Sequence, residues 1–146
     1  MVGAPLYAPG IAARPGLFSL QTPPAEALAH ADALLAEPEN PPEGGHIQGF
    51  VALQLGASEA RRQWPTAYFA ALGDRLWREA GLCPVLLGAP AESPLAQEYA
   101  ARASAPFVNA VGRTNIPQLA ALLTRTRLLA TNDTGTMHLA AGLGLP

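Results

Sequence analysis

The sequence contains no lysine, little net charge and only one cysteine, and the last two exclude classes of protein. All nine basic residues are arginine, and with eleven acidic residues the formal net charge is −2. A chain of this charge offers no basic surface for nucleic acid or an anionic membrane. The single cysteine, Cys83, has no partner for a disulfide within the chain, which is typical of a reducing compartment. It lies in an apolar stretch, so we expect a small buried hydrophobe.

Long apolar runs are also absent. Nowhere do eighteen apolar residues follow one another, so we expect no transmembrane segment. The first five residues carry no positive region leading into an apolar run, as a secretory signal would. These absences predict a cytoplasmic protein.

Glycine and proline divide the chain unevenly. Of its 29 glycine and proline residues, 14 precede position 50, and such a density of breakers disfavours long regular elements. We therefore expect residues 1–49 to be a weakly patterned segment with a linker at 37–45, and residues 50–146 to form the domain. Within the first segment, the pattern indicates a short strand at 17–20 and a helix over 22–36.

From residue 50 onward, short apolar runs alternate with segments of helical periodicity. This alternation predicts an α/β protein, a Rossmann-like parallel sheet with helices on both faces. The expected strands cover residues 50–55, 85–87, 107–111 and 128–131, and the expected helices cover residues 65–80, 93–103, 116–125 and 134–143.

The loops after the strands are the expected ligand site, because ligands of parallel sheets bind at the carboxyl ends of the strands. Each of these loops contains a glycine that permits close backbone approach, namely Gly56, Gly88, Gly112 and Gly135. In the last loop, a short strand breaks into a polar turn and opens a helix. Free backbone N–H groups at that helix start could hold a phosphate.

The first loop carries a hydroxyl at Ser58 and guanidinium groups at Arg61 and Arg62. Arginine can grip a phosphate with two hydrogen bonds, so the loop could form an anion cradle. The alternative is a solvated basic turn. Trp64 is interpreted as a packing residue at the entry of the following helix.

Three motifs, read together, resemble the donor-binding half of family-nine glycosyltransferases, the heptosyltransferase-like enzymes of lipopolysaccharide core synthesis. The resemblance covers residues 50–146. The motifs are Gly-Ala-Ser-x-x-x-Arg-x-Trp-Pro from Gly56, Leu-Leu-Gly-Ala-Pro-x-Glu from Leu86, and Asn-Asp-Thr-Gly-Thr-Met-His-Leu-Ala-Ala-x-Leu-Gly-x-Pro from Asn132.

This resemblance implies the GT-B fold, in which two Rossmann-like domains face each other. The C-terminal domain binds a nucleotide-diphospho-sugar such as ADP-heptose as substrate, and the N-terminal domain binds a glycolipid or saccharide acceptor. The resemblance implies that no metal and no cofactor is needed. It also implies a location in the cytoplasm or at the inner face of the inner membrane.

The resemblance also implies roles for residues of the first three loops. Ser58 and Arg62 occupy positions near the donor diphosphate, where the family more often has a lysine in place of the arginine. Glu92 occupies the position of a glutamate that holds the ribose hydroxyls, although it could instead favour the start of the next helix. Thr114 occupies the position that lines the nucleobase pocket.

The last loop matches the most recognisable motif of the family. Thr134 and Gly135 are expected to offer backbone N–H groups to the diphosphate. An aspartate would repel a diphosphate, so Asp133 is expected to cap the helix or order the turn. His138 lies one helical turn after Thr134, where an imidazolium could stabilise the departing nucleoside diphosphate. The alternative for His138 is a buried histidine bonded to backbone.

The family's general base has no counterpart in the sequence. In these enzymes it follows the first strand of the N-terminal domain in a Gly-Asp motif, and neither Asp32 nor Asp74 is placed to replace it. The family also continues beyond the last motif with a strand and a Gly-Pro-Thr loop. We therefore expect a domain that is incomplete at its C-terminus and inactive alone. A non-catalytic nucleotide-binding or interaction module derived from a glycosyltransferase is the alternative.

Overall fold

The computed structural model describes residues 22–132 and 134–146. The strand expected at 17–20 and the candidate residue Asp133 therefore lie outside the described residues. The elements alternate as expected from residue 50 onward. In chain order they are α1 (Ala25–Leu35), β1 (Gly49–Gln54), the 3-10 turn η2 (Ala60–Arg62), α2 (Thr66–Ala80), β2 (Leu82–Leu87), the 3-10 turn η3 (Pro90–Glu92), α3 (Ser93–Arg102), β3 (Val108–Asn109), α4 (Ile116–Thr124), β4 (Leu129–Thr131) and α5 (Gly135–Gly142).

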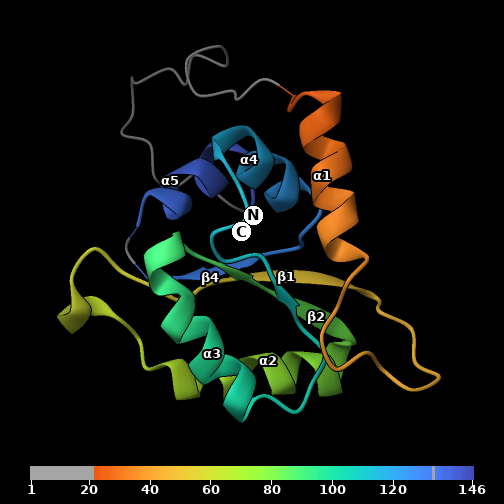
Figure 1. Cartoon of the computed structure of the whole chain (residues 1–146). Coiled ribbons are helices and arrows are strands. Elements are labelled where there is room, and N and C mark those ends of the chain that lie inside the picture. Colours follow the sequence, from red (N-terminus) through yellow and green to blue (C-terminus); the bar gives the residue numbers. More distant parts are fainter. Residues whose placement is uncertain (1–21, 133) are drawn as a thin grey trace, which may run out of the picture.

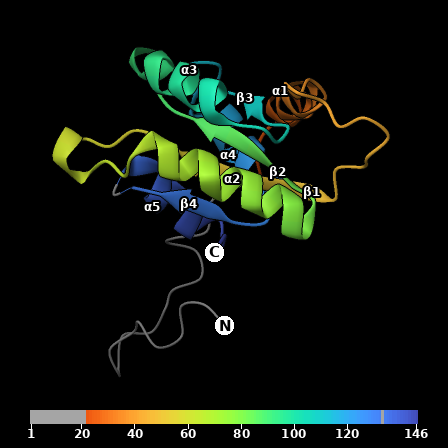
Figure 2. The same ribbon diagram turned by 90° about the horizontal axis from the view of Figure 1, so that it is seen from below.

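The four strands form one parallel sheet in the order β3-β2-β1-β4. Helices α2 and α3 cover one face, while α1, α4 and α5 cover the other (Figure 1; Figure 2). The chain first moves outward from β1 to β3, then returns through α4 to place β4 on the other side of β1. The expected fold class, a parallel sheet with helices on both faces, is confirmed.

Side chains of the strands alternate between two cores, because successive residues of a strand point to opposite faces. Val51 and Leu53 of β1 pack under α2 and α3, whereas Ala52 between them faces the other layer. The first core also holds Phe69 and Tyr99. The second holds small and branched residues of α1, α4 and α5, namely Ala27, Ala31, Leu34, Ala121, Leu122, Leu123 and Ala140.

Helix α1 lies before the boundary expected at residue 49 and contributes three of those buried side chains. Its outer surface is tied to α4 by Asp32, whose carboxylate accepts a hydrogen bond of 2.9 Å from Arg125. The segment expected as a linker is joined to the sheet at one point, where Glu39 and Phe107 exchange two backbone hydrogen bonds of 2.7 and 3.1 Å.

Strands β2 and β3 differ in length from the expected ranges. β2 begins three residues early, at Leu82, and includes Pro84. Proline cannot donate to a neighbouring strand, but β3 pairs only with Val85 and Leu86, so β2 has no partner on that side at Pro84. β3 ends at Asn109 because its side chain turns back to accept a hydrogen bond from the Val111 N–H at 3.1 Å.

Two residues interpreted from the sequence have the expected environments. Cys83 is completely buried, and this burial raises its pKa to about 12, so the thiol stays protonated. Asp74 does not face the strand ends. Its carboxylate accepts hydrogen bonds of 2.9 to 3.2 Å from the backbone N–H groups of Ser104 and Ala105, which joins α2 to the α3–β3 loop. Within the described ranges, every helix is too short or too polar to cross a lipid bilayer.

Gly73 supplies a stability test of the contact between α2 and α3. Replacing a helical glycine with alanine ordinarily stabilises a protein by about 1 kcal/mol. Here the added Cβ would collide with the Tyr99 hydroxyl and lie 3.0 Å from the Pro84 ring. We expect Gly73→Ala to destabilise the chain by about 1–3 kcal/mol, measured as the free energy of unfolding in urea.

The control is a double-mutant cycle with Tyr99→Phe. In the described part of the chain the Tyr99 hydroxyl is buried without a hydrogen-bond partner, so its removal alone should cost little. With the hydroxyl gone, Gly73→Ala should be less destabilising than in the parent chain. Additive effects of the two substitutions would show that the collision does not govern this contact.

Candidate functional site

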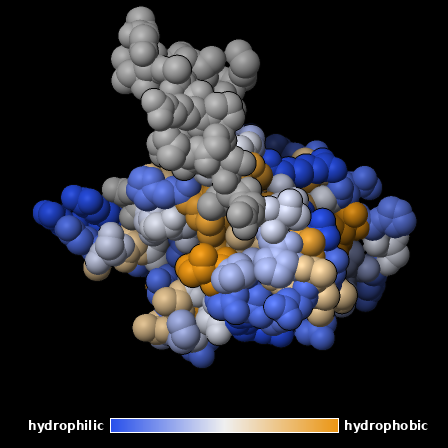
Figure 3. Space-filling view, turned by 90° about the horizontal axis from the view of Figure 1, so that it is seen from above, coloured by the Kyte–Doolittle hydropathy of each residue, from blue (hydrophilic) through white to orange (hydrophobic). Residues whose placement is uncertain are grey.

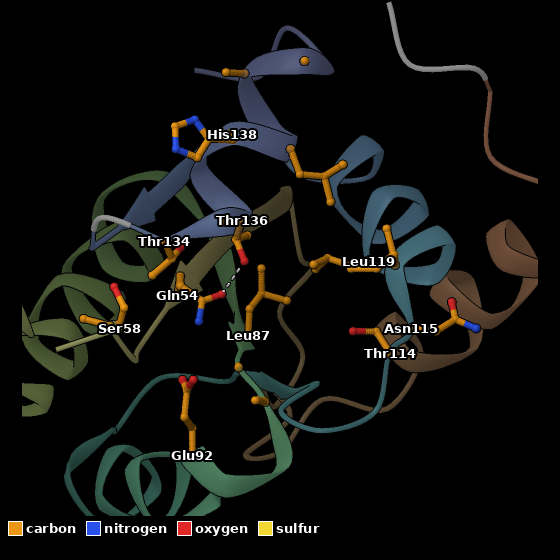
Figure 4. Close-up of a pocket in the computed structure, with 18 residues that line it drawn as sticks. Gln54, Ser58, Leu87, Glu92, Thr114, Asn115, Leu119, Thr134, Thr136 and His138 are labelled. Atoms are coloured by element: carbon orange, nitrogen blue, oxygen red, sulfur yellow. Dashed lines mark hydrogen bonds between the residues drawn. The ribbon is translucent and has the colours of Figure 1, made fainter. Parts of the chain in front are cut away.

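A cavity of about 1150 Å³ opens at the carboxyl ends of the four strands. It lies where the chain order of the sheet reverses, between β1 and β4, the usual ligand position in such folds. Residues of the four loops and of α4 and α5 surround it (Figure 4). The lining residues are Gln54, Ala57, Ser58, Leu87, Gly88, Ala89, Glu92, Thr114, Asn115, Ile116, Leu119, Thr134, Gly135, Thr136, His138, Leu139, Ala141 and Gly142.

Six of the eight residues predicted for the donor site line this cavity, although they span eighty positions of the chain. The parallel topology gathers them, because the loop after each strand opens at the same edge of the sheet. What each residue binds stays a prediction. The six are Ser58, Glu92, Thr114, Thr134, Gly135 and His138.

Arg62 is not placed with the other six. It lines a second cavity of about 630 Å³, together with Arg61, Trp64 and the end of β4. The reason is local: after Ser58 the chain enters the turn η2 and runs toward the start of α2, which carries Arg62 away from the larger cavity. Its Nε lies 3.9 Å from a carboxylate oxygen of Glu59. Trp64 packs edge-on against Phe69, at 4.8 Å between ring centres.

Glu92 occupies a cradle formed by two glycines. A Cβ atom at Gly56 would collide with its carboxylate, and one at Gly88 would lie 2.8 Å from its Oε2. The expectation was that these glycines let a ligand approach the backbone, but at these two positions they make room for Glu92. Among the described residues, Oε2 is buried and accepts no hydrogen bond. A buried carboxylate oxygen without a donor is costly, so it is suited to a ligand that brings hydroxyl groups.

The start of α5 borders the cavity and is not capped by the residue that precedes it. Thr134 is the residue before the helix, but its side chain does not cap it. Its hydroxyl instead lies 3.3 Å from the hydroxyl of Thr131. Gly135, the first helical residue, has open space where a side chain would be. The first N–H groups of a helix have no intrahelical acceptor, and they favour a negative charge.

His138 lies one turn further along α5 and is exposed, which removes the alternative of a buried histidine bonded to backbone. Its ring borders the cavity from the outer side of α5 (Figure 4). His30, for which the sequence indicated no place near the site, contacts the loop that carries Thr114. Its Nε2 lies 2.8 Å from the carbonyl oxygen of Arg113.

Asn132 is a buried residue whose role sequence reasoning missed. Its side-chain N–H groups donate to the carbonyl oxygens of Leu55 and Gly56, both at 3.1 Å, and more weakly to that of Gln54 at 3.4 Å. Its Oδ1 accepts from the Trp64 N–H at 2.9 Å. One side chain thus joins the loop after β4 to the loop after β1. The one feature of the sequence that could have indicated this role is the position of Asn132, an amide residue directly after an apolar strand.

The amino-acid sequence of this chain is similar to those of known glycosyltransferases. Residues 18–146 match glycosyltransferase family 9 (heptosyltransferase). The chain is 30% identical over 91 residues to lipooligosaccharide heptosyltransferase 2 of Haemophilus influenzae, an alignment that covers 58% of this chain and 25% of that protein.

Solved structures share the fold. A family 9 glycosyl transferase from Veillonella parvula superposes with a TM-score of 0.75 at 24% identity, over 88% of this chain and 35% of that one. The ADP-heptose LPS heptosyltransferase II of Escherichia coli gives 0.72 at 25% identity, over 88% and 38%. An E. coli heptosyltransferase with ADP-2-deoxy-2-fluoro heptose gives 0.57 at 23% identity, over 80% and 35%. The chain spans a quarter to two fifths of the length of these relatives.

The Asn132 contacts predict a large stability effect at a single side chain. Asn132→Ala leaves the Trp64 N–H and the carbonyl oxygens after β1 without their partner, so we expect a loss of about 2–4 kcal/mol in the free energy of unfolding. The matched control is Asn115→Ala, which removes only the capping box of α4 and should cost about 1 kcal/mol. Equal losses in chemical denaturation would mean that the link between the two loops is not what stabilises them.

Proposed function

Because the chain belongs to glycosyltransferase family 9, we propose that it binds the nucleotide-diphospho-sugar donor of a heptosyl or hexosyl transfer reaction. The donor is of the ADP-heptose type, and it occupies the larger cavity. One observation carries the proposal: two groups border the same cavity, namely the Glu92 Oε2, which has no partner among the described residues, and the start of α5, which the Thr134 side chain does not cap. The first suits hydroxyl groups and the second suits a phosphate, and a nucleoside diphosphate contains both.

The diphosphate is proposed to lie at the first turn of α5. Gly135 and Thr136 supply backbone N–H groups at the helix start, and Thr134 and Ser58, which carry hydroxyls, line the cavity beside it. These groups are all able to donate to phosphate oxygens. A helix start as a whole favours a nearby anion by roughly 0.3–1 kcal/mol, and by up to about 2 kcal/mol when partly buried, and the side-chain hydroxyls add hydrogen bonds to this.

The nucleoside is proposed to extend toward α4. Glu92 accepts hydrogen bonds from the two ribose hydroxyls, which satisfies its buried Oε2. Beyond it, Thr114 and the apolar side chains of Ile116 and Leu119 form the wall for the base. Ile116 is 68% exposed, so covering it with a flat base would remove apolar surface from water.

His138 is proposed to act on the leaving group. During transfer an acceptor hydroxyl attacks the anomeric carbon, the bond from that carbon to the β-phosphate oxygen breaks, and the diphosphate leaves with additional negative charge. An imidazolium one turn from the helix start lowers the energy of that charge. The acceptor, a saccharide or glycolipid, and the base that removes its proton are proposed to come from the second GT-B domain.

No cofactor enters this scheme, because the diphosphate already activates the sugar. A charged nucleotide sugar does not cross a lipid bilayer unaided, so the proposed function places the protein in the cytoplasm, where such donors are made. The alternative, a nucleotide-binding module without catalysis, shares the same cavity. It differs in one outcome, which is that the chain would bind a nucleoside diphosphate yet support no transfer when supplied with an acceptor domain.

Glu92 provides the direct test of the donor site. We expect ADP to raise the thermal midpoint of the 146-residue chain, because a ligand that binds only the folded state stabilises it. Glu92→Gln replaces an acceptor with an amide that accepts poorly from two hydroxyls, so ADP affinity measured by calorimetry should fall about tenfold or more. The control Glu98→Gln changes an exposed carboxylate of α3 that pairs with Arg102 and should leave the affinity unchanged.

Two results would count against this site. Absence of any thermal shift with ADP, GDP or UDP would remove the donor proposal altogether. A parent chain that binds ADP, with the same affinity in Glu92→Gln, would keep the ligand but place its ribose elsewhere.

Arg62 is proposed to approach the diphosphate only after η2 moves, since it lines the neighbouring cavity in this structure. We expect Arg62→Ala to reduce the midpoint shift produced by ADP, because one positive charge near the diphosphate is lost. Arg61→Ala, which removes the adjacent exposed arginine, is the comparison and should leave the shift intact. If ADP shifts the thermal midpoint of Arg62→Ala as much as that of the parent chain, Arg62 is excluded from the donor site.

A further inference from the structure

Gln54, the last residue of β1, is a polar side chain that the family motifs leave without a role. It is only 5% exposed, and it follows the buried apolar residues of the strand. Burial of an amide costs free energy unless its groups find hydrogen-bond partners. Its Oε1 accepts a hydrogen bond of 2.9 Å from the Thr136 hydroxyl. Within residues 22–132 and 134–146, no protein group accepts from its Nε2.

The bond to Thr136 holds the amide with its oxygen toward α5. Because the Thr136 hydroxyl holds the oxygen, the nitrogen faces the opposite way. Figure 4 shows it turned from Thr136 toward the part of the cavity between Ser58 and Glu92. Thr136 is the second residue of α5, so the amide lies beside the first turn of that helix. The N–H groups of the Gln54 amide therefore lie next to the backbone donors proposed for the diphosphate.

We propose that the Gln54 amide, oriented by Thr136, donates a hydrogen bond to a phosphate oxygen of the donor. This inference rests on the proposed function. The amide nitrogen can only donate and a phosphate oxygen can only accept, whereas Glu92 can only accept and needs hydroxyl groups. The two side chains thus divide the cavity by polarity. The phosphate end lies at Gln54 and α5, and the hydroxyl end lies at Glu92.

The test compares binding of ADP, AMP and adenosine to the 146-residue chain by calorimetry. Gln54→Leu keeps the approximate size of the side chain and removes the amide. It should weaken ADP binding about tenfold, the usual effect of losing a hydrogen bond to a charged group, and leave adenosine binding unchanged. Gln54→Glu should weaken ADP binding further, because a carboxylate would face the phosphate. The matched control is Gln97→Leu, at an exposed glutamine of α3.

Thr136 gives an independent readout that does not alter the amide itself. Thr136→Val removes the hydroxyl that orients Gln54 and should reduce ADP affinity by about threefold to tenfold, within the range of a neutral hydrogen bond. Thr136→Ser keeps the hydroxyl and should retain the parent affinity. This pair also decides the question if Gln54→Leu fails to fold.

The outcomes separate this inference from the proposed function. If the parent chain binds none of the three ligands and none of ADP, GDP and UDP shifts its thermal midpoint, the proposed function fails and this inference fails with it. If the parent chain binds ADP and neither Gln54→Leu nor Thr136→Val changes its affinity, only the role of Gln54 is overturned. If Gln54→Leu weakens adenosine as much as ADP, the amide acts on the nucleoside, and its assignment to phosphate is wrong.

Discussion

The site depends on one amide side chain, that of Asn132. β1 and β4 pair along three residues each and then separate, which opens the crevice where the chain order reverses. Beyond this pairing, the carbonyl oxygens of Leu55 and Gly56 have no neighbouring strand. Asn132 supplies the missing donors and also accepts from the Trp64 N–H. The topology therefore separates the loop after β1 from the loop after β4, and the Asn132 side chain joins the two loops by hydrogen bonds.

Within the crevice, polarity is distributed before any ligand arrives. Glu92 brings an acceptor into a space cleared by Gly56 and Gly88, and Gln54 and the start of α5 bring donors from the opposite side. Among the described residues, the Glu92 Oε2 and the Gln54 Nε2 have no hydrogen-bond partner, and burying such groups costs stability. Such a cost is expected at a binding site, because a ligand that bonds to both the acceptor and the donors recovers the lost free energy. The same polarity argues for a ligand with phosphate and vicinal hydroxyls together.

The fold was largely predictable, and specific residues show why. The alternation of apolar runs with helical periodicity reflects local requirements, so the strands and helices from residue 50 onward appear close to their expected positions. The expected strand lengths were wrong where pairing between strands distant in sequence decides where a strand begins or ends. β2 extends through Pro84 because β3 is too short to oppose it, and β3 ends early because Asn109 bonds to Val111. The helix expected over 22–36 is present as α1, but the boundary expected at residue 49 did not indicate that Ala27, Ala31 and Leu34 enter the core beside α4.

For the site, the sequence by itself determined which loops would meet, because parallel topology places every strand end at one edge of the sheet. It also identified six residues that border the cavity, through motifs read as a resemblance. Only the tertiary structure decided that Arg62 lines a separate cavity and that two glycines leave space for the Glu92 side chain. The hydrogen bonds of Asn132 and Gln54 also became evident only there. The physical reason is that side-chain direction and hydrogen-bond satisfaction depend on neighbours distant in sequence, such as Thr136 beside Gln54, which no local pattern records.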